Sequence, residues 1–505
     1  MKRIFALLLA TMALLLVSCD TTADPPATDP VITEAPRTEL PATAAPVTEP
    51  PVTEPPVTEL SITEPLTTTP PETEPAETEP ATTEPKTTIP VVEIFTADNQ
   101  PILSKTDYVQ GTMLIDGQRY PMKIRGRGNA SWHQFEKKAY RIKLDDGESL
   151  FGLPKDKDWV LVSSHPDKTL IRNSVAHAIA ASLDGLEYTP THVLINLYIN
   201  GDYRGVYTIA DKIEANSDKL DFSRKEGDTP SPFGGLDIGF LCEIGWDFDG
   251  ENVYNKDYFD AEKVLRIYVK EPEIPVPNTP ELTYTREYIY AMERAILEGN
   301  GWQDYIDIDS WVDWFIVTEL TFNTESAFYR SCYLWKREGG KLMMGPVWDF
   351  DMAFGNHMGD LSGYDGWCTT ESTYVYIMEN WMNYLLTYEE FTDAVKSRWA
   401  EKKDELLAVA LDAVDYYSAS LEGSWQQNFE RWDVLGRYVG VGAVNPYIYD
   451  TYEKQVQYLR DFIDQRWAYM DERITNGDIT PHRPVVNLPE ETEMAATENV
   501  ESETE

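Results

Sequence analysis

The sequence predicts an α+β fold, in which a sheet-rich N-terminal half precedes a mostly helical C-terminal half. Two observations support this prediction. Short alternating segments separated by turn residues fill positions 111–209, and helical spacing of apolar residues prevails after position 281. A hydrophobic content of 42% with 14 Trp is sufficient for a large core. We therefore expect a body of two lobes, with the cleft between them as the default binding site.

The strands follow from turns and from alternation. Asp116-Gly117 separates two apolar runs and is a hairpin signal, and residues 139–144 (AYRIKL) alternate between apolar and basic side chains. Asn200-Gly201-Asp202 is a second turn between two apolar runs. The predicted strands are 111–115, 118–124, 139–144, 159–162, 192–199 and 205–209.

The helices follow from apolar residues at three- and four-residue spacing. The predicted helices are 170–183, 281–298, 308–322, 389–416 and 449–475. One hairpin, near 328–336 and 341–347, interrupts the helical half and ends in Trp348-Asp349-Phe350-Asp351.

The sequence predicts that both ends of the chain lie outside the folded core. Residues 1–19 have Lys2 and Arg3 before an apolar run that ends in Leu-Val-Ser-Cys, which resembles a bacterial lipobox with lipid attached to Cys19. Residues 20–91 hold repeats of the TEP type, and Pro and like charges predict a disordered, extended stalk. The folded domain is then 92–480, and 481–505 is an acidic disordered tail. We expect an extracellular bacterial protein, held to the membrane by this lipid.

Net charge and missing motifs argue against several classes of function. The net charge of −43 argues against nucleic acid as a partner, because phosphate contacts need a basic surface. No HExxH motif, CxxC pair or GxSxG elbow is present, so a dedicated zinc site or an esterase-type nucleophile is not expected. Cys242, Cys332 and Cys368 are interpreted as buried thiols, although one disulfide among them stays open.

The segment GPVWDFDMAFGN, residues 345–356, is the sharpest local feature. In an extended backbone Asp349 and Asp351 would point the same way, with Trp348 and Phe350 on the opposite face. Two carboxylates so close repel each other unless a proton or a cation lies between them. Hard oxygen ligands of this kind suit Mg²⁺, Mn²⁺ or Ca²⁺, whereas the alternative is two solvated Asp at a strand end.

A second feature is the basic segment 123–144, in which two glycines lie between predicted strands. Glycine lets backbone N–H groups approach a phosphate, and nearby Lys and Arg supply charge. The alternative is a hairpin loop with a solvated basic face. The basic side chains of this segment include Arg125, Arg127, Lys137, Lys138, Arg141 and Lys143.

Taken together, these segments resemble the spore-coat protein H (CotH) kinase family. The matching stretches, in the family's order, are IRGRGNASW, KKAYRIKL, DWVLVSS, LIRN, INGDYRGVYTIADKIE, GGLDIGFLCEI and ELTFNTES through GPVWDFDMAFGN. The resemblance implies an atypical protein-kinase-like fold that binds ATP with Mg²⁺ or Mn²⁺ between a β-rich N-lobe and a helical C-lobe. It also implies phosphoryl transfer to Ser or Thr of a secreted or surface protein.

The resemblance assigns roles by position. Asp349 matches the family's metal-binding Asp, and Asp351 would hold or orient a second cation. Arg125 and Arg127 match its RG loop, and either Lys138 or Lys143 would contact the α and β phosphates. Alternation along the strand does not decide between these two lysines.

One position departs from the family pattern. Family members often carry Asn-x-Asp before the hairpin, with this Asp as the catalytic base, whereas Asn323-Thr324-Glu325 stands here. Glu325 can accept a proton, but its reach is one methylene longer. Three functions therefore remain open: an active surface kinase, a non-catalytic adhesion or scaffold protein on this fold, and a carbohydrate-active enzyme that uses paired carboxylates.

Overall fold

The computed structural model describes residues 89–228, 235–245, 253–257, 264–273, 279–357, 363–371, 380–439 and 448–479. The predicted signal peptide, Cys19, nearly all of the predicted stalk and the tail lie outside these residues. Within them, no helix is both long enough and apolar enough to span a membrane.

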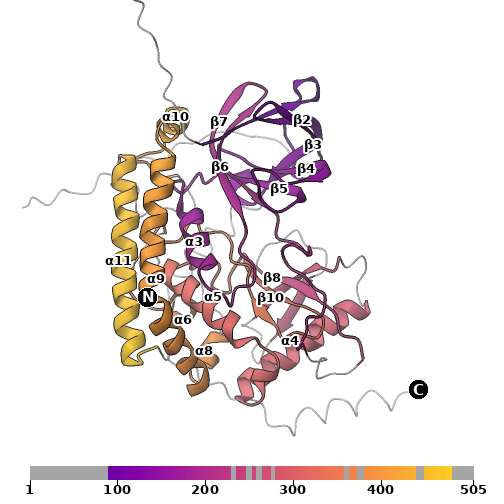
Figure 1. Cartoon of the computed structure of the whole chain (residues 1–505), viewed down its shortest axis with the longest axis vertical. Helices are drawn as coiled ribbons and strands as arrows, with labels where there is room; N and C mark the ends of the chain where they lie inside the picture. The colour runs from indigo at the N-terminus through magenta and orange to yellow at the C-terminus, as the bar shows by residue number, and fades with distance from the viewer. Residues whose placement is uncertain are drawn as a thin grey trace, which may run out of the picture. The chain divides into compact units, whose positions relative to one another are not determined.

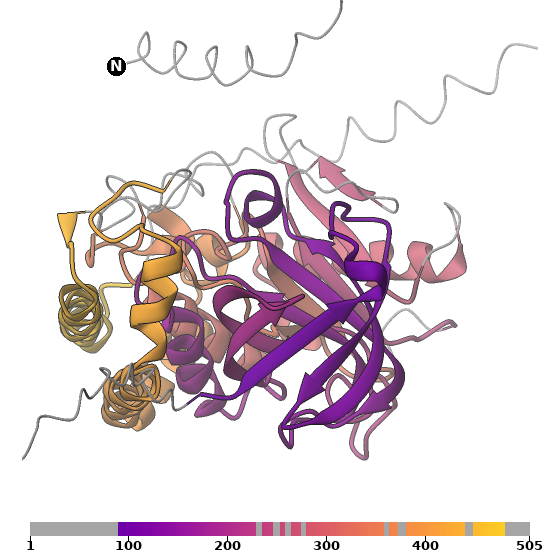
Figure 2. The ribbon, with the colours of Figure 1, turned by 90° about the horizontal axis from the view of Figure 1, so that it is seen from above.

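The N-terminal half of the described body is a closed barrel of seven strands (Figures 1 and 2). Its order is β1-β2-β3-β4-β5-β7-β6, and β1 pairs in parallel with β6 to close it. The strands are β1 (Val91–Thr96), β2 (Val109–Ile115), β3 (Gln118–Arg127), β4 (Ala139–Glu148), β5 (Asp156–Val162), β6 (His192–Ile199) and β7 (Asp202–Asp211).

The turn signals formed as predicted. Asp116 and Gly117 have φ angles of 49° and 78° and join Ile115 to Gln118, because a two-residue hairpin of this twist needs positive φ at both positions. Apolar side chains such as Ile94, Ile124 and Ile142 fill the barrel, so its interior is a packed core. The sequence analysis missed β1, whose partner β6 lies about a hundred residues later.

A second sheet, which the sequence analysis did not predict beyond one hairpin, has the order β12-β11-β8-β10-β9. Its strands are β8 (Phe240–Ile244), β9 (Val253–Asp257), β10 (Val264–Glu271), β11 (Cys332–Lys336) and β12 (Met343–Met344). The predicted hairpin strands 328–336 and 341–347 were too long. Phe328, Ser331 and Gly345 have positive φ, which interrupts extended backbone on both sides of the hairpin.

The remaining described elements are mostly helical. They are η1 (Ala97–Asn99), α2 (Ala130–His133), α3 (Arg172–Ala181), α4 (Pro280–Glu298), η2 (Trp302–Asp304), α5 (Ile308–Thr321), α6 (Cys368–Glu371), α8 (Met382–Leu385), α9 (Glu389–Ser420), α10 (Ser424–Arg431) and α11 (Tyr452–Asn476). The five predicted helices are confirmed as α3, α4, α5, α9 and α11. Local signals start three of them: Thr279, Asp307 and Thr451 accept backbone N–H groups at the first turns of α4, α5 and α11.

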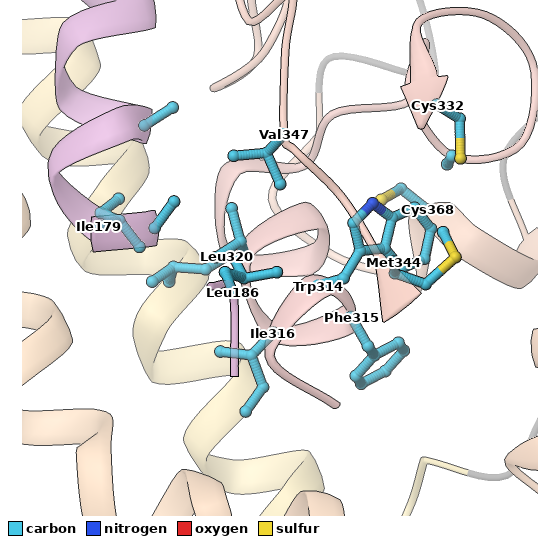
Figure 3. Packing of buried hydrophobic residues seen from close by; sticks show 14 of the residues in the cluster. Ile179, Leu186, Trp314, Phe315, Ile316, Leu320, Cys332, Met344, Val347 and Cys368 are labelled. Carbon is cyan, nitrogen blue, oxygen red and sulfur yellow. The ribbon is translucent and has the colours of Figure 1, made fainter. Parts of the chain in front are cut away.

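The largest core lies among these helices and the second sheet. Helix α5 is buried along its length, and α3, α9 and α11 pack against it. Figure 3 shows Ile316 and Leu320 of α5 on the side of Ile179 of α3, with Val347 close by and Trp314 of the same helix beside Met344. The polypeptide that precedes Trp348 is thus anchored in this core. Cys242, Cys332 and Cys368 are buried free thiols, as predicted.

The structure confirms the mixed α+β class. It shows a closed barrel, a five-stranded sheet and a helical core, and the kinase-like arrangement of two lobes stays a prediction.

Candidate functional site

Four segments distant in sequence form the candidate site. They are the end of β3 near Arg127, the segment 163–173 from the end of β5 into the start of α3, the turn 323–331 after α5, and the segment 345–356 after β12. Hydrogen bonds join the last three: Asn173 to Phe350, and Asn323 to Asp349. Electrostatic interaction between Arg127 and Asp349 brings in the barrel.

The Asp349–Asp351 segment is a turn and not the strand end that the sequence analysis assumed. Strand β12 ends at Met344, and Asp349 has a φ of 68°, in the left-handed region. The argument from strand alternation was therefore wrong. The two carboxylates are nevertheless close enough that the charge of Asp349 raises the pKa of Asp351.

Acidic side chains concentrate at this turn. Burial, and then the charges of Asp349, Glu325 and Asp167, raises the pKa of Asp351 well above its usual value. Burial and the Asp349 charge raise the pKa of Glu325 to about 8. Burial also raises the pKa of Asp349, although Arg127 and a hydrogen bond from Ser331 Oγ (3.2 Å) oppose this. The carboxylates repel one another in a desolvated site, which a bound cation would relieve.

Arg127, the last residue of β3, is a basic side chain of the barrel that interacts with Asp349. Burial lowers its pKa, and the charges of Asp349 and Glu243 oppose that shift. Its guanidinium lies 5.9 Å from the centre of the Trp348 ring. Arg127 can therefore offer hydrogen bonds to an anion beside the carboxylates.

The other predicted phosphate-binding residues make different contacts. Arg125 donates to the carbonyls of Lys105 and Gly126, and Lys138 donates to the carbonyl of Trp132 (2.6 Å). Lys143 is half-exposed, and its Nζ lies 3.3 Å from Asp158 Oδ2. These interactions do not involve Asp349, Asp351 or Glu325.

The sequence analysis gave no role to Lys137, Asp167 or Arg172. Asp167 and Arg172 form a fully buried ion pair of 2.5 Å beside Asp351. Lys137 is buried and donates to Val206 O (2.5 Å) and Asn428 Oδ1 (2.9 Å). Burial lowers its pKa to about 7, although the charge of Asp167 opposes this shift. The motifs KKAY and LIRN contained two of these residues, but only long-range contacts distinguish Lys137 from Lys138.

The donor set fits a divalent cation held jointly with phosphates. In the part of the chain that the structure describes, no three His, Cys, Asp or Glu side chains are grouped as a metal site. Magnesium commonly uses one or two carboxylates and completes its shell with water and substrate phosphates. Burial raises the pKa of both Asp349 and Asp351, and the charge of Asp349 raises that of Asp351 further, so this pair fits that mode of binding.

Comparison with known proteins gives one family. A comparison with curated proteins found no match. A family model described as CotH kinase protein matches residues 124–470. The match includes Arg127, Glu325 and the Asp349–Asp351 turn and covers most of the chain, and on this basis the chain belongs to the CotH kinase family.

Proposed function

We propose that this protein is an atypical protein kinase of the bacterial cell surface. It transfers the γ-phosphoryl group of ATP to Ser or Thr of a secreted or surface protein. Membership of the CotH kinase family supports a kinase-like protein. The single observation that carries the specific reaction is the convergence of Asp349, Asp351 and Glu325 with Arg127.

The proposed roles follow from the chemistry of phosphoryl transfer, which needs positioning and charge neutralisation more than a reactive nucleophile. Asp349 and Asp351 would hold Mg²⁺ or Mn²⁺, which would supply charge neutralisation for the phosphates. Arg127 binds phosphate oxygens from the barrel side. Arg125, Lys138 and Lys143 remain candidates for contacts with the outer part of the nucleotide.

Glu325 is the proposed base. The acceptor hydroxyl oxygen forms a bond to the γ-phosphorus, the bond from that phosphorus to the ADP oxygen breaks, and the hydroxyl proton passes to Glu325. This role requires the ionised carboxylate. With a divalent cation held by Asp349, its positive charge would favour the ionised form of Glu325.

We also propose the finer arrangement of the molecule. The barrel and the helical part act as the two lobes of a kinase-like fold, with ATP between them. The position of Arg127 at the end of β3, opposite the Asp349 turn, supports this. Lipid on Cys19 would hold the protein to the membrane, and residues 20–91 would extend the body toward its acceptors.

A non-catalytic binding protein is the second candidate. Glu325 replaces the expected Asp, and a pKa of about 8 leaves it largely protonated at neutral pH before a cation binds. A protein that has lost catalysis could retain this arrangement for binding.

Phosphate transfer distinguishes the two functions. The full chain is incubated with labelled ATP, Mg²⁺ or Mn²⁺ and a Ser-rich acceptor, and Asp349→Asn is compared with Asp393→Asn on the exposed face of α9. We expect Asp349→Asn to weaken Mg²⁺-dependent ATP binding at least about tenfold (about 1.4 kcal/mol) and to abolish transfer. The exposed variant should match wild type. Unchanged binding in Asp349→Asn would remove this residue from the site, and ATP binding without transfer by wild type would favour the non-catalytic function.

A further inference from the structure

The main chain of Trp348–Asp351 is hydrogen-bonded at every residue to a side chain. Each of the four residues uses its carbonyl or N–H group, and each partner is a buried side chain outside these four positions. Ser326 Oγ donates to Trp348 O (2.9 Å), Asn323 Nδ2 donates to Asp349 O (3.1 Å), Asn173 Oδ1 accepts from Phe350 N (2.8 Å), and Asn356 Nδ2 donates to Asp351 O (2.5 Å).

The four side chains are also joined to their surroundings. Asn323 and Asn356 are 1% and 3% exposed, so water does not compete for their amides. Asn323 Nδ2 also donates to Ser326 Oγ (2.9 Å), and Asn356 Nδ2 donates to Pro166 O (3.1 Å). These bonds connect the turn to α3, to the end of α5 and to the segment before α3.

The backbone of this turn needs such support. Asp349 has a φ of 68°, in the left-handed region that residues with a Cβ adopt less readily than glycine does. Such conformations persist where the surrounding structure holds them, and they concentrate at functional sites. In addition, the carboxylates of Asp349 and Asp351 repel each other, which favours separation of the turn when no cation is bound.

We propose that Asn173, Asn323, Ser326 and Asn356 form a side-chain clamp that fixes the main chain of residues 348–351 in the metal-binding conformation before a cation binds. They are positioning residues that act through Asp349 and Asp351. The inference rests on the proposed function, because it assigns those two carboxylates to the metal.

The clamp gives Asn323 a positioning role, whereas its place beside Asp349 suggests a metal ligand. An amide next to two metal-binding carboxylates is a natural candidate for a metal ligand. Here its Nδ2 donates to two acceptors, and its Oδ1 lies 3.4 Å from Ser326 N. These bonds assign Asn323 to holding the loop that carries the proposed ligand.

Two substitutions test the clamp. The measurement is the Mg²⁺ requirement of ATP binding, which a general loss of folding stability does not alter. In the full chain, Ser326→Ala and Asn323→Ala should raise the Mg²⁺ concentration required for half-maximal ATP binding by about tenfold, because each leaves a partly buried carbonyl without its donor. ATP binding without divalent cation should stay as in wild type. Ser326→Thr keeps the hydroxyl and should restore the wild-type Mg²⁺ requirement.

A matched control is Asn383→Ala, which removes another buried Asn that bonds a backbone group, the N–H of Asn380 (3.0 Å), at a distance from the turn. It should leave the Mg²⁺ requirement unchanged. If Asn323→Ala fails to fold, Ser326→Ala decides alone, since it removes one hydroxyl. Wild-type Mg²⁺ dependence in Ser326→Ala would overturn the clamp.

A crystal structure of Ser326→Ala separates this inference from the proposed function. We expect the Asp349 φ to leave the left-handed region or the Trp348 carbonyl to move from its place. An unchanged turn would refute the clamp even if the wild type binds Mg²⁺ and ATP. Conversely, a wild type that binds no Mg²⁺ or ATP would refute the proposed function, whereas a displaced turn would still support a clamp on the backbone.

Discussion

Glu325 is the residue on which catalysis depends most directly in this proposal. If it is the base, its carboxylate orients the acceptor hydroxyl and contributes little to ATP binding. Glu325→Gln should then lower turnover by about a hundredfold or more with ATP affinity nearly unchanged. Phosphate transfer and ATP titration measure the two quantities separately. Equal transfer by wild type and Glu325→Gln would exclude this base.

The shorter side chain tests how far the loop has adapted. Arg330 N donates to the Glu325 carbonyl (2.8 Å), and the Asn323–Ser326 contacts hold the same loop. We therefore expect Glu325→Asp to be less active than wild type, because the fixed backbone leaves the carboxylate short of the acceptor. Higher activity in Glu325→Asp would instead show a protein that has drifted away from catalysis.

Glu319 is a poor substitute base, because Arg466 and Thr369 already bond its carboxylate.

The raised pKa of Glu325 also predicts a pH-dependent cost in stability. The folded-state pKa of about 8 exceeds the ordinary value of 4.5, so the folded state binds more protons between these values and stability falls as pH rises through them. In metal-free buffer, Glu325→Gln should gain stability over wild type from pH 5 to pH 8.5, by more than about 1 kcal/mol. Urea unfolding at both values measures this, with Glu401→Gln on the exposed side of α9 as control. A constant difference between variant and wild type would contradict the shift.

At the scale of elements, helix α10 is joined to the barrel at Gly205. Asn428 Oδ1 accepts from Lys137 Nζ and from Val206 N (3.1 Å), and Trp432 Nε1 donates to Arg204 O (2.8 Å). This contact holds the barrel against the C-terminal part of the chain.

Gly205 permits that contact for two reasons. Its φ is 105°, and a Cβ there would lie 2.6 Å from Asn428 Oδ1. Gly201 has a φ of 80° with nothing near a Cβ, and is the matched control for backbone strain alone. We expect Gly205→Ala to lower the free energy of unfolding by about 1–3 kcal/mol more than Gly201→Ala does. Equal losses in urea unfolding would show that α10 moves aside without cost.

At the scale of the whole molecule, we expect the body to fold without its terminal segments. Ile89 and Ile479 are buried, and Pro90 O accepts from Asn196 N (2.8 Å), so residues 89–480 contain the contacts at both ends. This chain should be soluble and unfold in one cooperative transition, because the removed stalk and acidic tail lack apolar residues for a core and residues 1–19 are a predicted signal peptide. Residues 92–480, the boundary predicted from composition, should fold with lower stability. Calorimetry of both chains checks this, and a large loss in 89–480 relative to the full chain would contradict it.

The sequence by itself determined the features that arise from neighbouring residues. Turn residues at Asp116-Gly117, capping residues such as Asp307 and the helical spacing of apolar residues act over a few positions, and the elements that they predict are present. The WDFD motif likewise indicated two carboxylates close in sequence, although the extended backbone assumed for them was wrong. The family resemblance, which the match over residues 124–470 confirms, rests on the same local motifs.

Tertiary structure decided whatever depends on contacts between distant segments. The barrel closes through parallel pairing of Val91 with Asn196, for which alternation within one strand gives no signal. Lys137 and Lys138 are adjacent and chemically identical, yet only Lys137 is held by Asn428, almost three hundred residues later. Asp349 takes a left-handed backbone because buried side chains around it bond the turn, and no local pattern specifies that conformation.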